Sequence, residues 1–401
     1  MQQNKIPQLT TWLVATLGFI SILGPFGSDA YLPALPIMGN DLAHSPTAAQ
    51  TTLTAFSIGL ALGQLLMGTF SDAFGRRRLI ILGPTVMGFA SLLGAISQSI
   101  FTLFAACVLI GFSSSTGMVV GRAQISDLAT GLTASRAFSQ LGLFAGIGPI
   151  AGPLFGAVIL GFADWRAIFI GLSIMAFILA ALAIFQIPES LPKDKRQSAN
   201  VVAIFKAASS IAKNRMYLQH AIILWCTVAI MFAYISSSPF IIQKILGFTP
   251  FNYTLVFGTN GVGIMIAGAV ATAVAKKVSP RKVLGWGIGL QLSGAGILLG
   301  TWIMGTPSVW NILPALFLMV SAMGLMFGPA TALGLTQVRE RAGTALAIQG
   351  FVQFLIAGVM ATLVGLAGPM EFWPLALIVS VCSLTSLGFW IKTKRTLAEV
   401  V

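Results

Sequence analysis

The stretch Thr11–Pro33, TWLVATLGFISILGPFGSDAYLP, decides the fold of this 401-residue chain. It is almost entirely apolar and long enough to cross a bilayer, which takes about 20 residues in a helix. One ionisable group, Asp29, interrupts it. Charge at bilayer depth is costly, so an acid in such a position is by default a functional candidate. The stretch predicts a membrane-spanning helix whose carboxyl group carries a proton or faces a cationic ligand.

The whole chain shares the apolar character of this stretch. Hydrophobic residues make up 56% of it and charged residues 8%, whereas about a quarter of a soluble domain is charged. This composition excludes a soluble globule and predicts a polytopic membrane protein. The net charge of +13 indicates basic cytoplasmic loops and not a nucleic-acid partner. The three cysteines fall singly in separate apolar segments, so no metal site, disulfide framework or cofactor is expected.

Charges, prolines and glycines divide the chain into twelve candidate spans, which predicts an all-α membrane protein. Their boundaries lie near residues 11–33, 49–71, 79–98, 101–124, 138–160, 166–187, 217–238, 251–274, 283–303, 309–333, 344–366 and 372–391.

The basic residues orient these spans. With the N-terminus in the cytoplasm, 21 of the 23 Lys and Arg residues fall inside, and only Arg166 and Lys244 fall outside. Cytoplasmic loops collect such residues, so both termini are predicted to be cytoplasmic. The longest polar stretch predicts a central linker at 188–216 between six-helix bundles at 1–187 and 217–401. Two bundles of this kind predict a transporter with its site between the halves.

The loop between the second and third spans has a distinctive pattern of glycines and charges. Its sequence, GTFSDAFGRRR at residues 68–78, places an acid between two glycines and ends in three arginines. Gly68 permits close helix contact, and Gly75 permits a sharp turn. Asp72 is placed to pair with an arginine or to cap a helix.

This loop resembles the signature G-x-x-x-D-x-x-G-R-[RK]-[RK] of the major facilitator superfamily, with matches at Gly68, Asp72, Gly75 and Arg76 onward. The resemblance implies twelve helices in two six-helix bundles. It also implies a cytoplasmic latch that stabilises one access state. Asp72 and Arg76 would belong to this latch, with Arg122 and Asp127 at the end of the fourth span as partners.

The fifth span contains Gly148-Pro149-Ile-Ala-Gly152-Pro153, in which glycines allow tight helix packing and prolines bend the helix. This order is similar to the antiporter motif of drug-exporting facilitators. Ser28-Asp29-Ala-Tyr31-Leu-Pro33, with Asp164-Trp165-Arg166 before the sixth span, resembles the bicyclomycin and chloramphenicol resistance subfamily of drug:proton antiporters. The resemblance implies proton coupling through Asp29.

One departure from that family concerns the middle of the fourth span. Antiporter members usually carry R-x-x-Q-G there, whereas this chain has Cys107-Val-Leu-Ile-Gly111. The missing arginine leaves Asp29 without the cationic neighbour that the family implies. Coupling to protons therefore stays an open question from the sequence.

The predicted function is export of small, largely apolar compounds across the bacterial cytoplasmic membrane. The substrate cavity implied by the fold contains polar or amphipathic groups from four spans. The expected partners are a small-molecule substrate, protons and the lipid bilayer, and the expected state is a monomer. An exporter of a native metabolite (an amino acid, nucleoside, sugar or siderophore), coupled to protons or uncoupled, fits the same features. An enzyme does not, because no catalytic cluster is found. The cavity candidates are Tyr31, Tyr234, Asn260, Gln349 and Gln353.

Overall fold

The computed structural model describes residues 9–43, 46–196, 211, 213–338, 342–368 and 370–398. Within these residues the chain is helical and contains no strand. Twelve of its helical segments are long and apolar enough to cross a membrane, which confirms the predicted number of spans and the all-α class. Most of the linker predicted at 188–216 lies outside the described residues.

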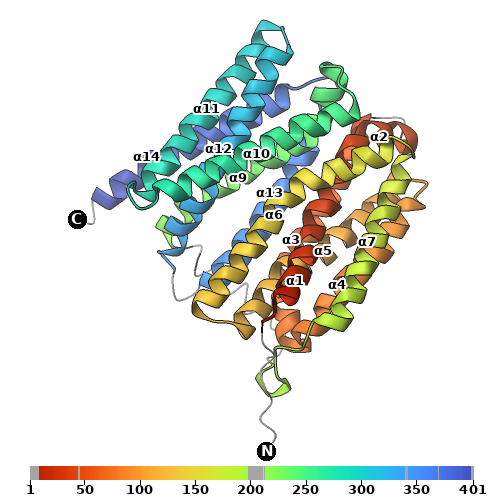
Figure 1. Cartoon of the computed structure of the whole chain (residues 1–401). Coiled ribbons are helices and arrows are strands. Elements are labelled where there is room, and N and C mark those ends of the chain that lie inside the picture. Colours follow the sequence, from red (N-terminus) through yellow and green to blue (C-terminus); the bar gives the residue numbers. More distant parts are fainter. Residues whose placement is uncertain are drawn as a thin grey trace, which may run out of the picture. The chain divides into compact units, whose positions relative to one another are not determined.

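The described residues of the first half form seven α-helices and three short 3-10 turns (Figure 1). In chain order they are α1 (Thr11–Asp29), η1 (Leu32–Ala34), α2 (Leu35–Ala43), η2 (Pro46–Ala49), α3 (Gln50–Phe74), α4 (Arg76–Ala95), α5 (Ile100–Leu128), α6 (Gly131–Leu160), α7 (Trp165–Gln186) and η3 (Lys193–Lys195).

In the second half, the residues that the structure describes form six α-helices and one π-helical turn, η4. They are α9 (Arg215–Phe240), η4 (Ile241–Ile245), α10 (Pro250–Val274), α11 (Pro280–Met304), α12 (Val309–Leu335), α13 (Ala342–Gly365) and α14 (Trp373–Ala398).

The chain divides into two compact units. Unit 1 comprises residues 1–45 and 55–201, and unit 2 comprises 46–54 and 202–401. In unit 1, α1 packs against α5, α6 and α7, while α4 packs against α5 and α7. Figure 1 shows α1 running alongside α5 and α6. In unit 2, α9 packs against α12, α13 and α14.

Polar side chains start several of these helices by accepting hydrogen bonds from free backbone N–H groups. Thr10 Oγ1 accepts from Leu13 N at 3.2 Å at the start of α1, and Ser99 Oγ accepts from Thr102 N at 3.2 Å at the start of α5. Such caps satisfy donors that the helix cannot pair internally. The lipid-facing remainder of each helix then needs no polar partner, because every backbone group inside it is already bonded.

Glycines allow α3 and α5 to approach closely inside unit 1. A Cβ atom added at Gly59 would meet the backbone oxygen of Val108, and one at Gly111 would meet that of Phe56. Small residues have this role in helix contacts within lipid. At Gly68, by contrast, the nearest atom to an added Cβ is Val119 Cγ1 at 3.8 Å, which is ordinary contact.

The ends of several predicted spans differ from the helices observed. The fifth was expected to begin at residue 138, but α6 begins at Gly131. The first was expected to end at Pro33; α1 ends at Asp29, while the membrane span continues through η1 and α2 to Leu42. Tyr31 there has φ −95° and ψ 3°, outside helical values, in front of a proline at position 33 that lacks a backbone donor. The fourth was expected to end at residue 124, but α5 continues to Leu128. Asp127 therefore lies within the helix and not after it, as Arg122 already did in the predicted span.

Candidate functional site

The junction between α3 and α4 depends on Gly75. Its φ is +98°, a conformation that costs glycine little and other residues much. An added Cβ would also meet the Glu189 carboxylate and the Arg196 guanidinium. Gly75 is therefore required both by its backbone conformation and by its neighbours.

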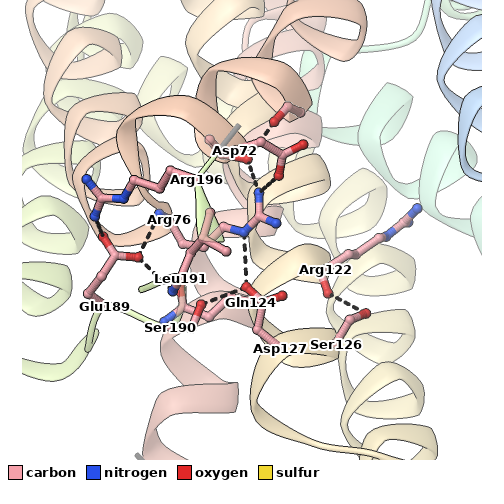
Figure 2. Close-up of polar contacts among 12 residues, drawn as sticks. Asp72, Arg76, Arg122, Gln124, Ser126, Asp127, Glu189, Ser190, Leu191 and Arg196 are labelled. Carbon is pink, nitrogen blue, oxygen red and sulfur yellow. Dashed lines mark hydrogen bonds and ion pairs between the residues drawn. The ribbon is translucent and has the colours of Figure 1, made fainter. Parts of the chain in front are cut away.

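Arg76, the first residue of α4, is buried and lies at the centre of a cluster of polar groups (Figure 2). Its Nε donates to Asp127 Oδ2 at 3.0 Å, and its Nη1 pairs with Asp72 Oδ1 and donates to Ser71 Oγ. These four residues, Ser71, Asp72, Arg76 and Asp127, are called the Arg76 cluster below. A guanidinium removed from water needs such partners, because an uncompensated buried charge is expensive.

The segment after α7 is bound to the same cluster, which the sequence did not predict. Glu189 Oε1 accepts from the backbone N of Arg76 at 2.9 Å and from that of Leu191 at 3.0 Å. Its Oε2 pairs with Arg196 at 3.3 Å. Ser190 Oγ donates to Asp127 Oδ2 at 2.9 Å. The only signal in the sequence was one glutamate at the start of a basic polar stretch.

Arg122 does not take part in these contacts, although the resemblance implied it as a partner. Figure 2 shows its side chain leading away from Arg76, while its backbone oxygen accepts from Ser126 Oγ at 3.2 Å. Of the residues expected in the latch, the structure brings together Asp72, Gly75, Arg76 and Asp127. Gly68 lies one turn earlier on α3.

Asp29 is the last residue of α1 and is 4% exposed. Ser28 Oγ donates to its Oδ1 at 2.7 Å. On the α6 side it faces Gly152, where an added Cβ would lie 3.3 Å from Asp29 Cβ. The acid is therefore enclosed between its own helix and a glycine of α6.

The predicted antiporter motif forms the surface of α6 that contacts α1. An added Cβ at Gly148 would lie 2.8 Å from Pro25, and one at Gly156 would meet the backbone oxygen of Ala30. Pro149 and Pro153 lie inside α6, which continues from Gly131 to Leu160. The motif thus packs directly on the part of α1 that ends in Asp29.

Tyr31 is fully buried in unit 1. Its ring stacks on that of Phe169 with centroids 5.5 Å apart. Cys107, on α5, is also fully buried, so an uncharged thiol stands where the resemblance implies an arginine.

The other four cavity candidates belong to unit 2. Asn260 Nδ2 donates to Tyr234 Oη at 2.8 Å, and the Tyr234 ring stacks on Phe257 with centroids 5.5 Å apart. Gln349 is buried and Gln353 is half-buried on α13. The structure thus joins Tyr234 and Asn260 directly, across α9 and α10.

A second polar cluster in unit 1 joins α2 to the start of α7. Asp41 Oδ2 accepts from Trp165 Nε1 at 3.0 Å and from Arg166 Nη1 at 2.9 Å. The Arg166 guanidinium lies 4.3 Å from the centre of the Trp165 ring. Asp164 caps α7 by accepting from the backbone N of Arg166 at 3.0 Å. The sequence analysis missed Asp41 because its two partners, Trp165 and Arg166, follow it by 124 and 125 residues.

No group of three or more His, Cys, Asp or Glu side chains that could hold a metal ion occurs in the described part of the chain. The polar groups present instead form ion pairs, helix caps and one enclosed acid. Such groups can hold a conformation or carry a proton.

Comparisons with known proteins agree with this arrangement. The family model described as Major Facilitator Superfamily matches residues 17–362. An "Uncharacterized MFS-type transporter YdgK" of Bacillus subtilis is 31% identical, over 96% of each chain. A "Bicyclomycin resistance protein homolog" of Haemophilus influenzae is 28% identical, over 99% of each. The solved structure of a D-xylose-proton symporter has a TM-score of 0.70 at 18% identity, covering 94% of this chain and 97% of that one.

Proposed function

Because this chain belongs to the Major Facilitator Superfamily, a family of membrane transporters and not of enzymes, we propose that it exports small, largely apolar compounds. The export is driven by protons and proceeds by alternating access. Its similarity to a protein named for bicyclomycin resistance supports drugs as the substrate class. The Gly-Pro pattern at 148–153, typical of exporting members, supports the direction of transport.

Asp29 is the proposed proton carrier, and its enclosure is the observation that carries the proposal. It is 4% exposed and lies against Gly152 of the antiporter motif. A carboxylate in such surroundings is costly unless it is protonated or paired. In the outward-facing state a proton neutralises Asp29, and in the inward-facing state release of the proton favours binding of the substrate.

The proposed location is the bacterial cytoplasmic membrane, with both termini in the cytoplasm and the protein acting as a monomer. The asymmetry of 21 basic residues against two supports this orientation.

The Arg76 cluster is the proposed cytoplasmic latch. Its ion pairs join α3, α4 and α5 inside unit 1, and such pairs stabilise whichever access state keeps them intact. Gly75 shapes the junction of α3 and α4, and Gly68, one turn before Asp72 on α3, is kept as a proposed latch residue. The residues proposed to line the substrate cavity are still Tyr31, Tyr234, Asn260, Gln349 and Gln353. Amphipathic groups with few fixed charges suit ligands of varied structure.

Replacing Asp29 tests the proposal. Asp29→Asn removes the titratable proton and keeps the size of the side chain, so drug uptake driven by a proton gradient into inverted vesicles should fall at least tenfold. Asp29→Glu keeps the acid and should retain part of the uptake. Asp194→Asn removes an exposed acid and should change nothing. Undiminished gradient-driven uptake by Asp29→Asn would contradict the proposed role.

A second candidate function is uncoupled export of a native metabolite. The buried Cys107 thiol favours it, because an uncharged group stands where the resemblance implies the family's coupling arginine. An uncoupler separates the two candidates, since it abolishes proton-driven uptake into vesicles and leaves uncoupled, gradient-independent exchange intact.

A further inference from the structure

A cavity of about 330 Å³ lies within unit 1, among α1, α5 and α6. Its walls include Pro25 from α1, Met118 and Arg122 from α5, and Phe138, Leu141 and Gly142 from α6. All of these residues except Arg122 are apolar. The cavity is therefore a hydrophobic pocket with one cationic group in its wall.

Arg122 lines this pocket and is exposed. The ion pairs among the described residues do not include it. Asp127, the acid nearest to it along α5, is five residues further on and thus about 140° around the helix. That carboxylate is already bonded to Arg76 and Ser190. The guanidinium keeps its donors for a group that enters the pocket.

The other polar side chain in the pocket is committed elsewhere. Ser21 Oγ lies 2.9 Å from the backbone oxygen of Leu17 and 3.1 Å from that of Gly117, and it donates to these acceptors. Arg122 consequently favours a ligand with a negative charge, and the apolar walls favour a ligand whose remaining part is hydrophobic.

Gly142 shows that the α6 side of the pocket is open. An added Cβ at this position would meet no atom within 4 Å, although Gly142 lines the cavity. A larger side chain can therefore project into the pocket without displacing the backbone, and it would occupy the volume that a ligand needs.

We propose that this pocket binds a small aromatic monoanion, a carboxylate or a sulfonate, as a substrate of the transporter. Its acid group pairs with the Arg122 guanidinium, which matches such oxygens in a bidentate geometry. Its ring packs against Met118 and Phe138, since sulfur and aromatic groups both favour ring contacts. The volume is near the lower limit of ligand pockets, about 300 Å³, so it fits one or two rings. This inference rests on the proposed export function and specifies a substrate class for it.

Binding to the purified full chain in lipid nanodiscs tests the charge selection. The probes are radiolabelled 1-naphthalenesulfonate and the uncharged 1-naphthalenesulfonamide, which have nearly the same shape. The wild type should bind the sulfonate about tenfold more tightly than the sulfonamide, because a charge-assisted bond is at stake. Arg122→Gln should remove this preference and leave sulfonamide binding unchanged, while Arg122→Lys should keep part of it. Lys282→Gln, which removes an exposed cation from unit 2, should have no effect.

Gly142→Leu tests the location. It fills the pocket from the open side, so it should weaken binding of both probes at least tenfold. Equal affinity of the wild type for the two probes, or a sulfonate preference that survives Arg122→Gln, would overturn the inference. Normal binding of both probes to Gly142→Leu would overturn it too. These assays need no proton gradient, so failure of gradient-driven drug uptake would count against the proposed function and not against this pocket.

Discussion

At the scale of single residues, the polar groups of this protein are few, and most of them are engaged. Arg76 has two carboxylates and a hydroxyl around it, Asp41 holds both Trp165 and Arg166, and Asn260 is bonded to Tyr234. Arg76 and Asn260 are buried, so each partner lost there leaves a polar group that water cannot readily reach. Single substitutions at these positions therefore act on conformation as much as on chemistry.

Gly75 provides a residue-scale prediction with a matched control. Gly75→Ala imposes φ near +98° on a residue with a Cβ and brings that Cβ against Glu189 and Arg196. Gly368→Ala imposes a similar φ, +94°, in open space. Backbone strain of this kind costs about 1–3 kcal/mol. Thermal unfolding in detergent should show the Gly75→Ala variant to be less stable than the Gly368→Ala variant. Equal melting temperatures of the two variants would show that the neighbours of Gly75 add nothing to the loss of stability.

The individual residues also show how far the sequence can be interpreted. Asp29 was found because one acid in an apolar stretch is conspicuous, and the pairing of Arg76 with Asp72 and Asp127 followed from a motif. Glu189 and Asp41 were not found, because their partners lie 113 and more than 120 positions away. Only the packing of helices brings such groups together, and the composition of the chain does not indicate which helices pack against each other.

At the scale of elements, the segment that leaves α7 is held to unit 1 before it reaches the undescribed part of the linker. Glu189 binds two backbone N–H groups and Arg196. Gln124 Nε2 donates to the backbone oxygen of Pro188 at 2.8 Å. Residues 188–196 are thus anchored on α4 and α5, and their position depends on the loop that begins α4.

Removing the Glu189 carboxylate should release this segment. Glu189→Ala should speed trypsin cleavage after Arg196 about fivefold in detergent-solubilised protein, because cleavage follows the population of the opened form and two hydrogen bonds and an ion pair are lost. Asp194→Ala, which removes an exposed acid of the same segment, is the control. Mass spectrometry of early fragments identifies the cleaved bond. An unchanged rate in the Glu189→Ala variant would mean that the segment does not depend on this carboxylate.

The helices themselves were predicted well from local apolar runs, since the length of a span is set by the bilayer. Their ends were predicted less well. α5 continues beyond residue 124, because a polar sequence can stay helical once its backbone bonds are made. α1 stops at Asp29, because the backbone angles of Tyr31 depart from helical values before η1. These features depend on caps and backbone angles that hydropathy does not report.

At the scale of the whole molecule, the chain forms two compact units that together contain the twelve spans among the described residues. The family and the number of spans are established. The orientation rests on the distribution of basic residues, which is a property of the entire chain and is open to a direct test.

Reporter fusions should confirm that orientation. Alkaline phosphatase, which is active only outside the cytoplasm, should be active when fused after Gly247, which follows seven spans and η4. The same reporter should be inactive after Arg196 and at the C-terminus, where a cytoplasmic fluorescent reporter should instead be bright. Phosphatase activity at the C-terminus would reverse the orientation and with it the direction of transport.

The glycine surface of α6 has one more consequence for the acid at the end of α1. On that side Asp29 is covered by Gly152 and not by a side chain, so no rotamer change on α6 uncovers it. Hydration from this direction requires two backbones to move apart. The distance between α1 and α6 should therefore depend on the surrounding lipid, because bilayer thickness changes the tilt and position of spanning helices. The transport turnover of the protein should therefore differ between short-chain and long-chain lipids.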